Sequence, residues 1–362
     1  MIKTFYIGLM SGTSLDGIDG ILTSFKKKHY TFHVPFPKKF KNDLLSLQSK
    51  GLNEIHREAT ASINLVKLYS KCVKMLLQKA NIDKSQVKAI GAHGQTIRHQ
   101  PEIGYSKQIN NPSLLSELTG IDVISDFRSG DIAAGGQGAP LVSLFHKEFF
   151  NDSKFTIVIL NIGGISNITI LRPKSKVIGF DTGPGNILMD FWTYENQKKS
   201  FDKNGYWAKS GKVNKKLLNK MLKDPYFLRK PPKSTGRDLF NEFWLKEKLE
   251  NFKYENPTNI QTTIAQLTIK SISDAIKKYA PLSKNIFVCG GGALNKYILQ
   301  ELKNETKINV CLTDTLGIPT QFVESMAFAW LAMRFCEGLT GNVPTVTGAK
   351  GKRILGSLSK TN

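Results

Sequence analysis

Four short glycine-rich segments, each placed after an apolar stretch, are the features of this 362-residue chain with the clearest chemical potential. They are SGTSLDG at 11–17, NIGG at 161–164, DTGPGN at 181–186 and CGGGALN at 289–295. Glycine lets the backbone approach a ligand closely, and turn amides and hydroxyls can donate hydrogen bonds to phosphate oxygens. The first segment lacks the lysine of a P-loop. A single glycine turn is usually structural, but four of them favour phosphate binding.

Aspartates stand at two of these turns. Asp181 follows the apolar stretch KVIGF and is expected to open the turn before Gly183, where its carboxylate could act as a general base. The alternative is an Asx-type turn cap. Asp16 and Asp19 end the first turn, where a carboxylate could hold Mg²⁺ with water and phosphates, or cap a hairpin. Asp16 is the preferred metal ligand of the two.

The elements that must position these turns occur in two similar sets. Residues 3–25 predict a strand, a glycine turn and a second strand, and Phe155–Leu171 repeat this order. Further apolar strands follow in both halves: VKAIGAHGQT, IDVISDFRSGDIA (ending near Arg128), and KVIGFDTGPGN. Helical spacing covers 54–80 and 258–280, the latter with Thr258 and Gln261 as a capping box. TQFVESMAFAWLAMRFC predicts a mostly apolar helix, either buried or packed between domains.

Strands that alternate with helices indicate an α/β chain with mixed sheets and ligands at the strand ends. The length of 362 residues fits two domains. We expect an N-terminal domain at 1–127 and a C-terminal domain at 128–338, with the tail 339–362 packing back on the N-terminal domain.

Composition narrows the class of protein. The net charge of +22 comes mainly from lysines scattered over the chain, which disfavours a nucleic-acid partner. No apolar run approaches the ~20 residues of a membrane helix. The four cysteines form no CxxC, which argues against zinc and disulfides and fits a reducing compartment. Without a signal-peptide pattern at the start, a cytoplasmic protein is expected.

The layout resembles the superfamily of sugar kinases, Hsp70-type chaperones and actin. The resemblance implies two RNase H-like domains with an interdomain cleft for ATP and substrate. SGTSLDG and NIGGISN would be the two phosphate hairpins, and CGGGALN would be the turn near adenosine. A chaperone would also need a peptide-binding domain, for which the chain has no room.

Within that superfamily the chain closely resembles the anhydro-N-acetylmuramic acid kinase family. The resemblance covers Ile7 to about Gly348. Its motifs are GLMSGTSLDGID, AHGQT, DFRSGDIAAGGQGAPL, LNIGGISNIT, GFDTGPGN, STGRDLFN, GGGALN and TQFVESMAFAWLA. It implies a kinase that uses ATP and water to convert 1,6-anhydro-N-acetylmuramic acid to N-acetylmuramic acid 6-phosphate in peptidoglycan recycling. It also implies a homodimer.

In that reaction O6 starts as an ether oxygen and carries no proton. Water must attack C1, so the base belongs beside that water, and the family match assigns this role to Asp181. ATP binding is implied for Gly12, Thr13, Ser14, Leu15, Asp16, Gly17, Ile18, Asp19, Gly163, Gly164, Gly290, Gly291 and Gly292. Substrate contact is implied for His93, Arg128, Asp181 and Glu324.

Each sugar-contact residue has a structural alternative. His93 could be a structural hydrogen-bonding group, and Arg128, whose guanidinium could grip the lactyl carboxylate, could instead pair with Asp126 or Asp131. Glu324 could be the acidic residue of a helix N-terminus, and Arg237 is a weaker candidate. The competing functions are another ATP-dependent small-molecule kinase, and a chaperone or nucleic-acid binder.

Overall fold

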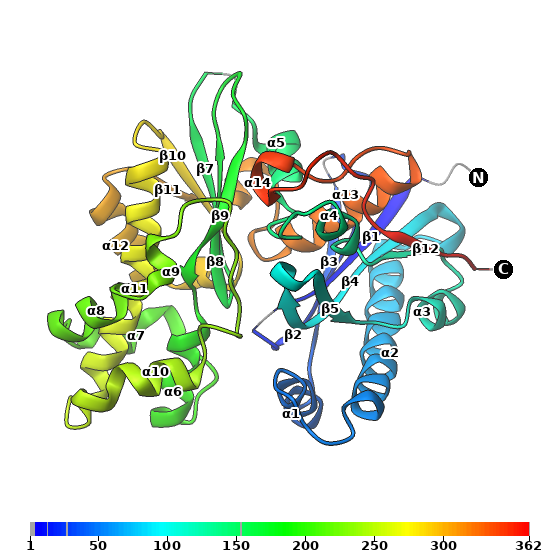
Figure 1. Cartoon of the computed structure of the whole chain (residues 1–362). Coiled ribbons are helices and arrows are strands. Elements are labelled where there is room, and N and C mark those ends of the chain that lie inside the picture. Colours follow the sequence, from blue (N-terminus) through cyan, green and yellow to red (C-terminus); the bar gives the residue numbers. More distant parts are fainter. Residues whose placement is uncertain (1–3, 13, 27, 153, 362) are drawn as a thin grey trace. The chain divides into compact units, whose positions relative to one another are not determined.

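A computed structural model describes residues 4–12, 14–26, 28–152 and 154–361. The chain divides into two compact units, and most of their elements are labelled in Figure 1. Unit 1 comprises residues 1–145 and 322–362, and unit 2 comprises residues 146–321. These limits differ from the expected domain boundaries, because residues 128–145 and 322–338 belong to unit 1.

The sheet of unit 1 combines a three-stranded antiparallel meander with parallel strands. Its strands are β1 (Phe5–Ser11), β2 (Gly17–Thr23), β3 (His29–Pro35), β4 (Val87–Gln100), β5 (Tyr105–Ile109), β6 (Val123–Ser125) and β12 (Ser357–Ser359). The order is β12-β6-β4-β1-β2-β3, with β5 paired to β4. β1, β2 and β3 are antiparallel neighbours, whereas β4 runs parallel to β1 and β6 runs parallel to β4.

The sheet of unit 2 repeats that plan. Its strands are β7 (Ile157–Ile162), β8 (Ile165–Leu171), β9 (Ile178–Pro184), β10 (Asn285–Cys289) and β11 (Asn309–Leu312), in the order β11-β10-β7-β8-β9. β7, β8 and β9 form the antiparallel meander, and β10 and β11 continue in parallel from β7. The order β6-β4-β1-β2-β3 in unit 1 matches β11-β10-β7-β8-β9 in unit 2, which confirms the predicted duplicated α/β architecture.

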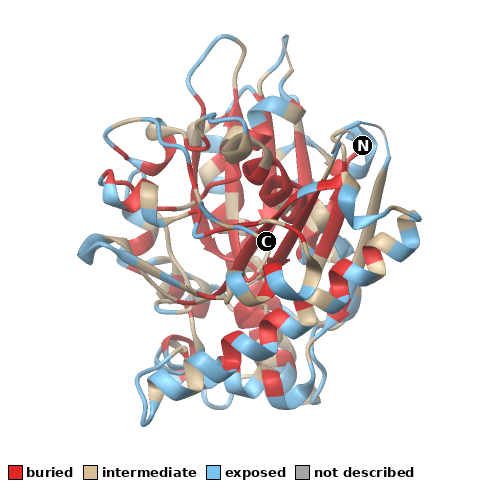
Figure 2. Cartoon of the chain, turned by 90° about the vertical axis from the view of Figure 1, so that its right-hand side faces the viewer, coloured by how far each residue is buried: buried red, intermediate tan, exposed pale blue. Residues whose placement is uncertain are grey.

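Helices supply the covering layers. They are α1 (Lys38–Ser46), α2 (Glu54–Ala80), α3 (Pro112–Thr119), α4 (Ser129–Ala133), α5 (Ser143–Phe150), α6 (Ile187–Gln197), α7 (Tyr206–Ser210), α8 (Lys215–Leu222), α9 (Pro225–Leu228), α10 (Glu242–Leu249), α11 (Pro257–Tyr279), α12 (Lys296–Thr306), α13 (Val323–Cys336) and α14 (Pro344–Thr347). The apolar stripe of α2 packs into the core of unit 1, and that of α11 packs into the core of unit 2. Burial is concentrated along the strands, while the helices carry both buried and exposed residues (Figure 2).

Helix α13 lies directly against the unit 1 sheet, and two glycines make this approach possible. A Cβ atom at Gly8 of β1 would overlap the Ser325 carbonyl oxygen, and one at Gly91 of β4 would overlap the Phe328 carbonyl oxygen. Nearly every residue from Val323 to Ala332 is buried. The predicted buried helix is therefore confirmed.

Two local predictions were wrong. The strand expected to reach Arg128 ends at Ser125, and Arg128 instead precedes the short helix α4. The capping box at Thr258 is absent: α11 begins at Pro257, and the Asn256 side chain accepts the hydrogen bond from the Thr258 amide. Pro at the first helical position already lacks an N–H, so the start moves to the Asn-Pro pair. Among the described residues, no helix is long and apolar enough to cross a membrane.

Candidate active site

The first glycine turn connects β1 to β2 in unit 1. Leu15 is buried with a φ of 56°, and its amide donates to the Gly12 carbonyl oxygen at 3.2 Å. The Ser14 hydroxyl donates to an Asp16 carboxylate oxygen at 2.7 Å, and Asp16 is exposed. Thr13 lies outside the described residues. The turn is thus closed by its own backbone and presents Asp16 to solvent.

Asp19 lies inside β2 and differs from Asp16 in its surroundings. It is opposite His33 of β3 in the strand register, and its carboxylate lies 2.8 Å from His33 Nδ1. The hydrogen bond to Asp19 raises the pKa of His33, while burial raises the pKa of Asp19 against the opposing effect of His33. Asp19 therefore has a protein partner already, which leaves Asp16 as the solvent-facing carboxylate of the turn.

Three glycine segments meet in unit 2. The Gly185 and Asn186 amides each donate at 2.8 Å, to the carbonyl oxygens of Gly164 and Gly163 respectively. Gly292 lies so close to Ile162 that a Cβ atom there would overlap the Ile162 side chain. The structure thus brings together NIGG, DTGPGN and CGGG, which are separated in sequence. The three segments share glycine residues, which leave the backbone uncovered by side chains.

Asp181 lies within a strand, not at the opening of a turn as predicted. β9 continues through Pro184, and a bulge falls beside Asp181: Ser166 pairs with Gly183 and Asn167 pairs with Asp181, leaving Thr182 as the extra residue. Bulges of this kind redirect a side chain next to an active site. Asp181 is only 6% exposed, so its carboxylate is held by the protein rather than by bulk water.

A loop that follows α9 holds Asp181 from two sides. The Thr235 amide donates to Asp181 Oδ2 at 2.9 Å, and the Asp181 amide donates to the Lys233 carbonyl oxygen at 3.2 Å. The Tyr226 hydroxyl donates to the Asp181 carbonyl oxygen at 2.7 Å. Burial, followed by the charge of Asp181, raises the pKa of Tyr226, so the phenol keeps its proton and remains a donor.

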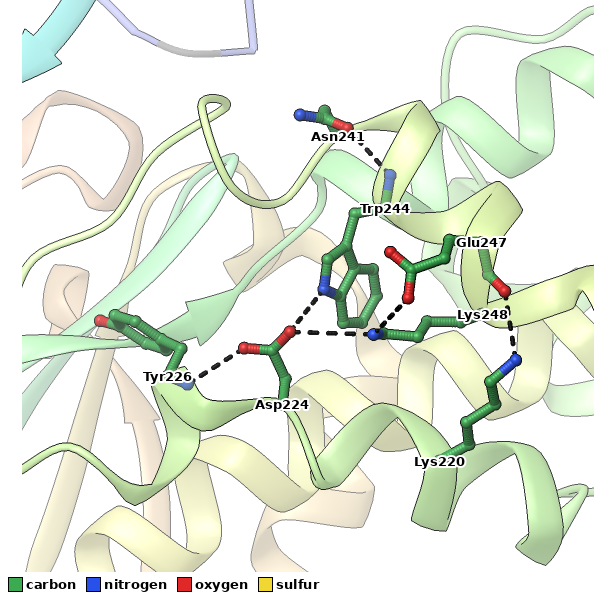
Figure 3. A network of polar contacts seen from close by, with 7 residues as sticks. All are labelled: Lys220, Asp224, Tyr226, Asn241, Trp244, Glu247 and Lys248. Atoms are coloured by element: carbon green, nitrogen blue, oxygen red, sulfur yellow. Dashed lines mark hydrogen bonds and ion pairs between the residues drawn. The ribbon is translucent and has the colours of Figure 1, made fainter.

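Tyr226 is itself held by a buried polar network (Figure 3). Asp224 accepts from the Tyr226 amide at 3.0 Å and from Trp244 Nε1 at 2.8 Å. The Lys248 ammonium lies 4.0 Å from Asp224 Oδ2. Asn241 accepts from the Trp244 amide at 3.0 Å. The aromatic residue behind Asp181 is therefore fixed by α9 and α10 together.

Two basic residues from the same loop lie in this region. The Lys233 ammonium is 4.5 Å from the centroid of the Tyr226 ring, and burial lowers the pKa of Lys233 to about 8 although Asp181 acts in the opposite direction. Burial also lowers the pKa of Arg237 to about 10, with Asp190 opposing it. The electrostatic surroundings of Asp181 thus include a lysine whose charge is easily lost.

His93 and Arg128, both in unit 1, form a hydrogen-bonded pair. Arg128 Nη2 and Nε lie 2.8 Å and 3.2 Å from His93 Nε2, and His93 Nδ1 lies 2.8 Å from the Gly94 carbonyl oxygen. Burial and the neighbouring Arg128 charge hold the pKa of His93 well below its usual value. His93 is therefore neutral, donates from Nδ1 and accepts at Nε2, which positions the Arg128 guanidinium.

The remaining predicted residues have defined places. Glu324 lies in the first turn of α13 and is half-buried. Asp126 accepts from the Ser129 hydroxyl at 2.6 Å. Asp131 accepts from the Gly138 amide and from the Asn342 and Thr347 side chains. The carboxylates considered as partners of Arg128 thus serve the local backbone and the C-terminal segment.

Sequence reasoning did not single out Asn167, Tyr226 or Thr235. Asn167 and Thr235 fall inside the quoted motifs LNIGGISNIT and STGRDLFN, so the motifs contained the signal. Their proximity to Asp181 depends on strand register and on the path of the loop after α9, which no local pattern specifies.

Comparison with known proteins gives one consistent result. A family model described as anhydro-N-acetylmuramic acid kinase matches residues 4–361. A protein of that name from Pseudomonas syringae pv. syringae is 48% identical to this chain, and the match covers 98% of both chains. Another from Ralstonia nicotianae is 46% identical, and the match covers 99% of this chain and 97% of that protein. A solved structure of Acidaminococcus fermentans (R)-2-hydroxyglutaryl-CoA dehydratase component A shows 11% identity and a TM-score of 0.49, covering 91% of this chain and 96% of that chain. A likeness that low indicates nothing about activity.

Proposed function

The chain belongs to the anhydro-N-acetylmuramic acid kinase family, and from this premise we propose that it converts 1,6-anhydro-N-acetylmuramic acid, ATP and water to N-acetylmuramic acid 6-phosphate and ADP. The observation that best supports this reaction is the setting of Asp181. A buried carboxylate at a strand bulge, oriented by the Thr235 amide, has the features of a fixed general base.

The bond changes require a base at a particular place. Water attacks C1 and forms the C1–O bond, the C1–O6 bond breaks, and O6 forms a bond to the γ-phosphorus of ATP as ADP leaves. The water proton passes to Asp181. O6 has no proton to lose, so a base beside O6 would have nothing to accept, whereas a base beside C1 increases the nucleophilicity of the water.

The glycine turns of both units are proposed to bind ATP. In unit 2, Gly163 and Gly291 have room where a side chain would stand, so their backbone can approach phosphates, whereas Gly292 packs against Ile162. In unit 1, Gly12 and Ser14 of the turn between β1 and β2 are proposed to offer backbone donors. We propose that units 1 and 2 are the two ATPase-type domains of the family.

Mg²⁺ fits the donor set of the first turn. Asp16 is exposed and lies at the end of the turn. Among the described residues no three His, Cys, Asp or Glu side chains gather in a metal-binding group. A single carboxylate with retained waters and nucleotide phosphates is how Mg²⁺ is commonly bound. Asp16 would hold the ion, which neutralises phosphate charge during transfer.

Arg128 is proposed to bind the lactyl carboxylate of the sugar. Its guanidinium is fixed before the substrate arrives, because Nε and Nη2 are directed at neutral His93 and Nη1 donates to the Gly138 carbonyl oxygen. The carboxylate would take the remaining N–H groups of Nη1 and Nη2. His93 then acts mainly through Arg128, because both of its ring nitrogens are engaged within unit 1. Glu324, in the first turn of α13, is proposed to face the sugar hydroxyls.

Product analysis in ¹⁸O-water tests the proposed function. The purified chain is incubated with ATP, Mg²⁺ and 1,6-anhydro-N-acetylmuramic acid, and the product is examined by mass spectrometry and phosphorus NMR. We expect one ¹⁸O at C1 of a 6-phosphorylated sugar. Phosphorylation of ordinary hexoses, with no reaction of the anhydro sugar, would instead identify a different small-molecule kinase. Sedimentation of the same sample tests the proposed homodimer, and fractionation tests the proposed cytoplasmic location.

A further inference from the structure

A row of polar residues crosses three strands of the unit 2 sheet. In the strand register, Asn161 of β7 is opposite Asn167 of β8, and Asn167 is opposite Asp181 of β9. Directly opposed residues of antiparallel strands point to the same face, with Cβ atoms about 5 Å apart. The alternate positions Leu160, Ile168 and Phe180 lie in the apolar core. Asn167 is therefore the cross-strand neighbour of the proposed base.

Two buried oxygens next to Asp181 have no hydrogen-bond partner among the described residues. They are Asn167 Oδ1 and Thr235 Oγ1. Such a group costs about 1–3 kcal/mol when it is left unpaired. The adjacent hydroxyls of Ser166 and Thr182, by contrast, lie 2.6 Å apart and satisfy each other. The two unpaired oxygens therefore need a specific explanation, and a bound molecule at a functional site is a common one.

The positions of these oxygens define what the molecule must be. The Thr235 amide donates to Asp181 Oδ2, and the Thr235 hydroxyl is carried by the same residue, buried and without a hydrogen-bond partner in the described part of the chain. Asn167 Oδ1 and the Asp181 carboxylate are acceptors, whereas the Thr235 hydroxyl can also donate. A water molecule offers two hydrogens and two lone pairs. An organic hydroxyl has only one hydrogen and cannot satisfy both acceptors.

We propose that Asn167 and Thr235 are catalytic residues that, together with Asp181, hold the water that attacks C1. This inference rests on the proposed function. The water donates one hydrogen to Asp181 and the other to Asn167 Oδ1, and it accepts from the Thr235 hydroxyl. One lone pair is then left to form the bond to C1. As the C1–O bond forms and the C1–O6 bond breaks, the proton on the Asp181 side moves to that carboxylate.

Variants that each remove one polar group separate this role from a structural one. Thr235→Val removes the hydroxyl but keeps the amide that orients Asp181, and Asn167→Ala removes the acceptor. We expect kcat to fall roughly 100-fold in each, as for other small losses of positioning, while KM for the sugar changes little. Thr235→Ser, the matched control, keeps the hydroxyl and should stay within about 3-fold of the wild-type kcat.

Thermal unfolding of the same proteins provides a second measurement. Thr235→Val removes an unpaired buried oxygen, so the variant should unfold at the same or a higher temperature than the wild type. When a residue is retained for function, its substitution is expected to lower activity without lowering stability. A fall in kcat accompanied by a fall in unfolding temperature would contradict the proposed role of Thr235.

Competition between water and methanol as nucleophiles tests directly whether Asn167 accepts a hydrogen bond from the attacking water. Methanol has one hydrogen, so it leaves one acceptor unpaired in the wild type but not in Asn167→Ala. In mixtures of the two, the ratio of methyl glycoside 6-phosphate to hydrolysed product should rise at least about 10-fold in Asn167→Ala. An unchanged ratio would overturn the role of Asn167.

Asn167→Asp adds a pH test. It retains an acceptor but places a second carboxylate beside Asp181, and like charges raise the pKa of such a pair. The acidic limb of the plot of kcat against pH should move to higher pH. If that limb does not move, residue 167 does not lie beside Asp181 as proposed. If the wild type itself does not convert the anhydro sugar, the proposed function fails. If it does and the variants match it, only this inference fails.

Discussion

Asp181 illustrates how a single residue depends on its surroundings. Its carboxylate accepts from the Thr235 amide, and its backbone is held by Tyr226 and Lys233. Asp181→Asn keeps the size of the side chain but cannot accept a proton. We expect kcat to fall by about 10³-fold or more, within the range for loss of a general base. ATP affinity, measured by calorimetry, should remain within a few-fold, and near-normal turnover would remove Asp181 from the proposed mechanism.

His33 and Asp19 belong to the same scale and predict a pH dependence of stability. The hydrogen bond to Asp19 raises the pKa of His33 in the folded state. Its stabilising contribution is therefore fully present below about pH 6.5, the unfolded value, and is lost as pH rises through the folded value. The urea midpoint of the wild type exceeds that of His33→Gln by a difference that should decrease as the pH is raised from 6 to 9. A difference that stays flat would show that the pair adds no linked stability.

At the scale of elements, the contact between α13 and the unit 1 sheet depends on glycine. Gly91→Ala places a methyl group against the Phe328 carbonyl oxygen, so α13 must shift from β4. We expect a loss of about 1–3 kcal/mol or more in the free energy of unfolding, measured with urea. Gly130→Ala is the matched control, because its methyl group would meet only atoms at 3.7 Å. Equal effects of the two substitutions would contradict this explanation.

At the scale of the whole molecule, the chain leaves unit 1, builds unit 2 and returns. The returning segment supplies α13, the β12 strand paired to β6, and two side chains, Asn342 and Thr347, that donate to the fully buried Asp131. Removing residues 342–362 leaves that carboxylate short of donors and exposes the edge of β6. Hydrogen exchange should show lost protection in unit 1, while unit 2 stays protected.

A shorter truncation controls for the loss of the terminus itself. Removing only the last two residues removes the hydrogen bond that the Thr361 amide donates to Asp122 at 3.0 Å. This protein should exchange like the wild type in both units. If the longer truncation leaves unit 1 equally protected, the C-terminal segment does not complete that unit.

The main strands and the long helices were already predicted from the sequence. Hydrophobic periodicity specified α2 and α11 to within about one residue, and α13 with a start about three residues too early. Glycine-rich turns after apolar strands located the segments that meet in unit 2. These features are local, because a helix or a turn is selected by residues close to one another along the chain. The family motifs likewise indicated Asp181, His93 and Arg128 from the sequence alone.

Tertiary structure decided what surrounds those residues. A bulge at Thr182 keeps Asp181 inside β9, and the strand register places Asn167 opposite it. The loop after α9 brings Thr235 to the same carboxylate, and the pairing of Arg128 with His93 joins residues that are 35 positions apart. Register and loop path result from long-range packing, so no short window of sequence contains them.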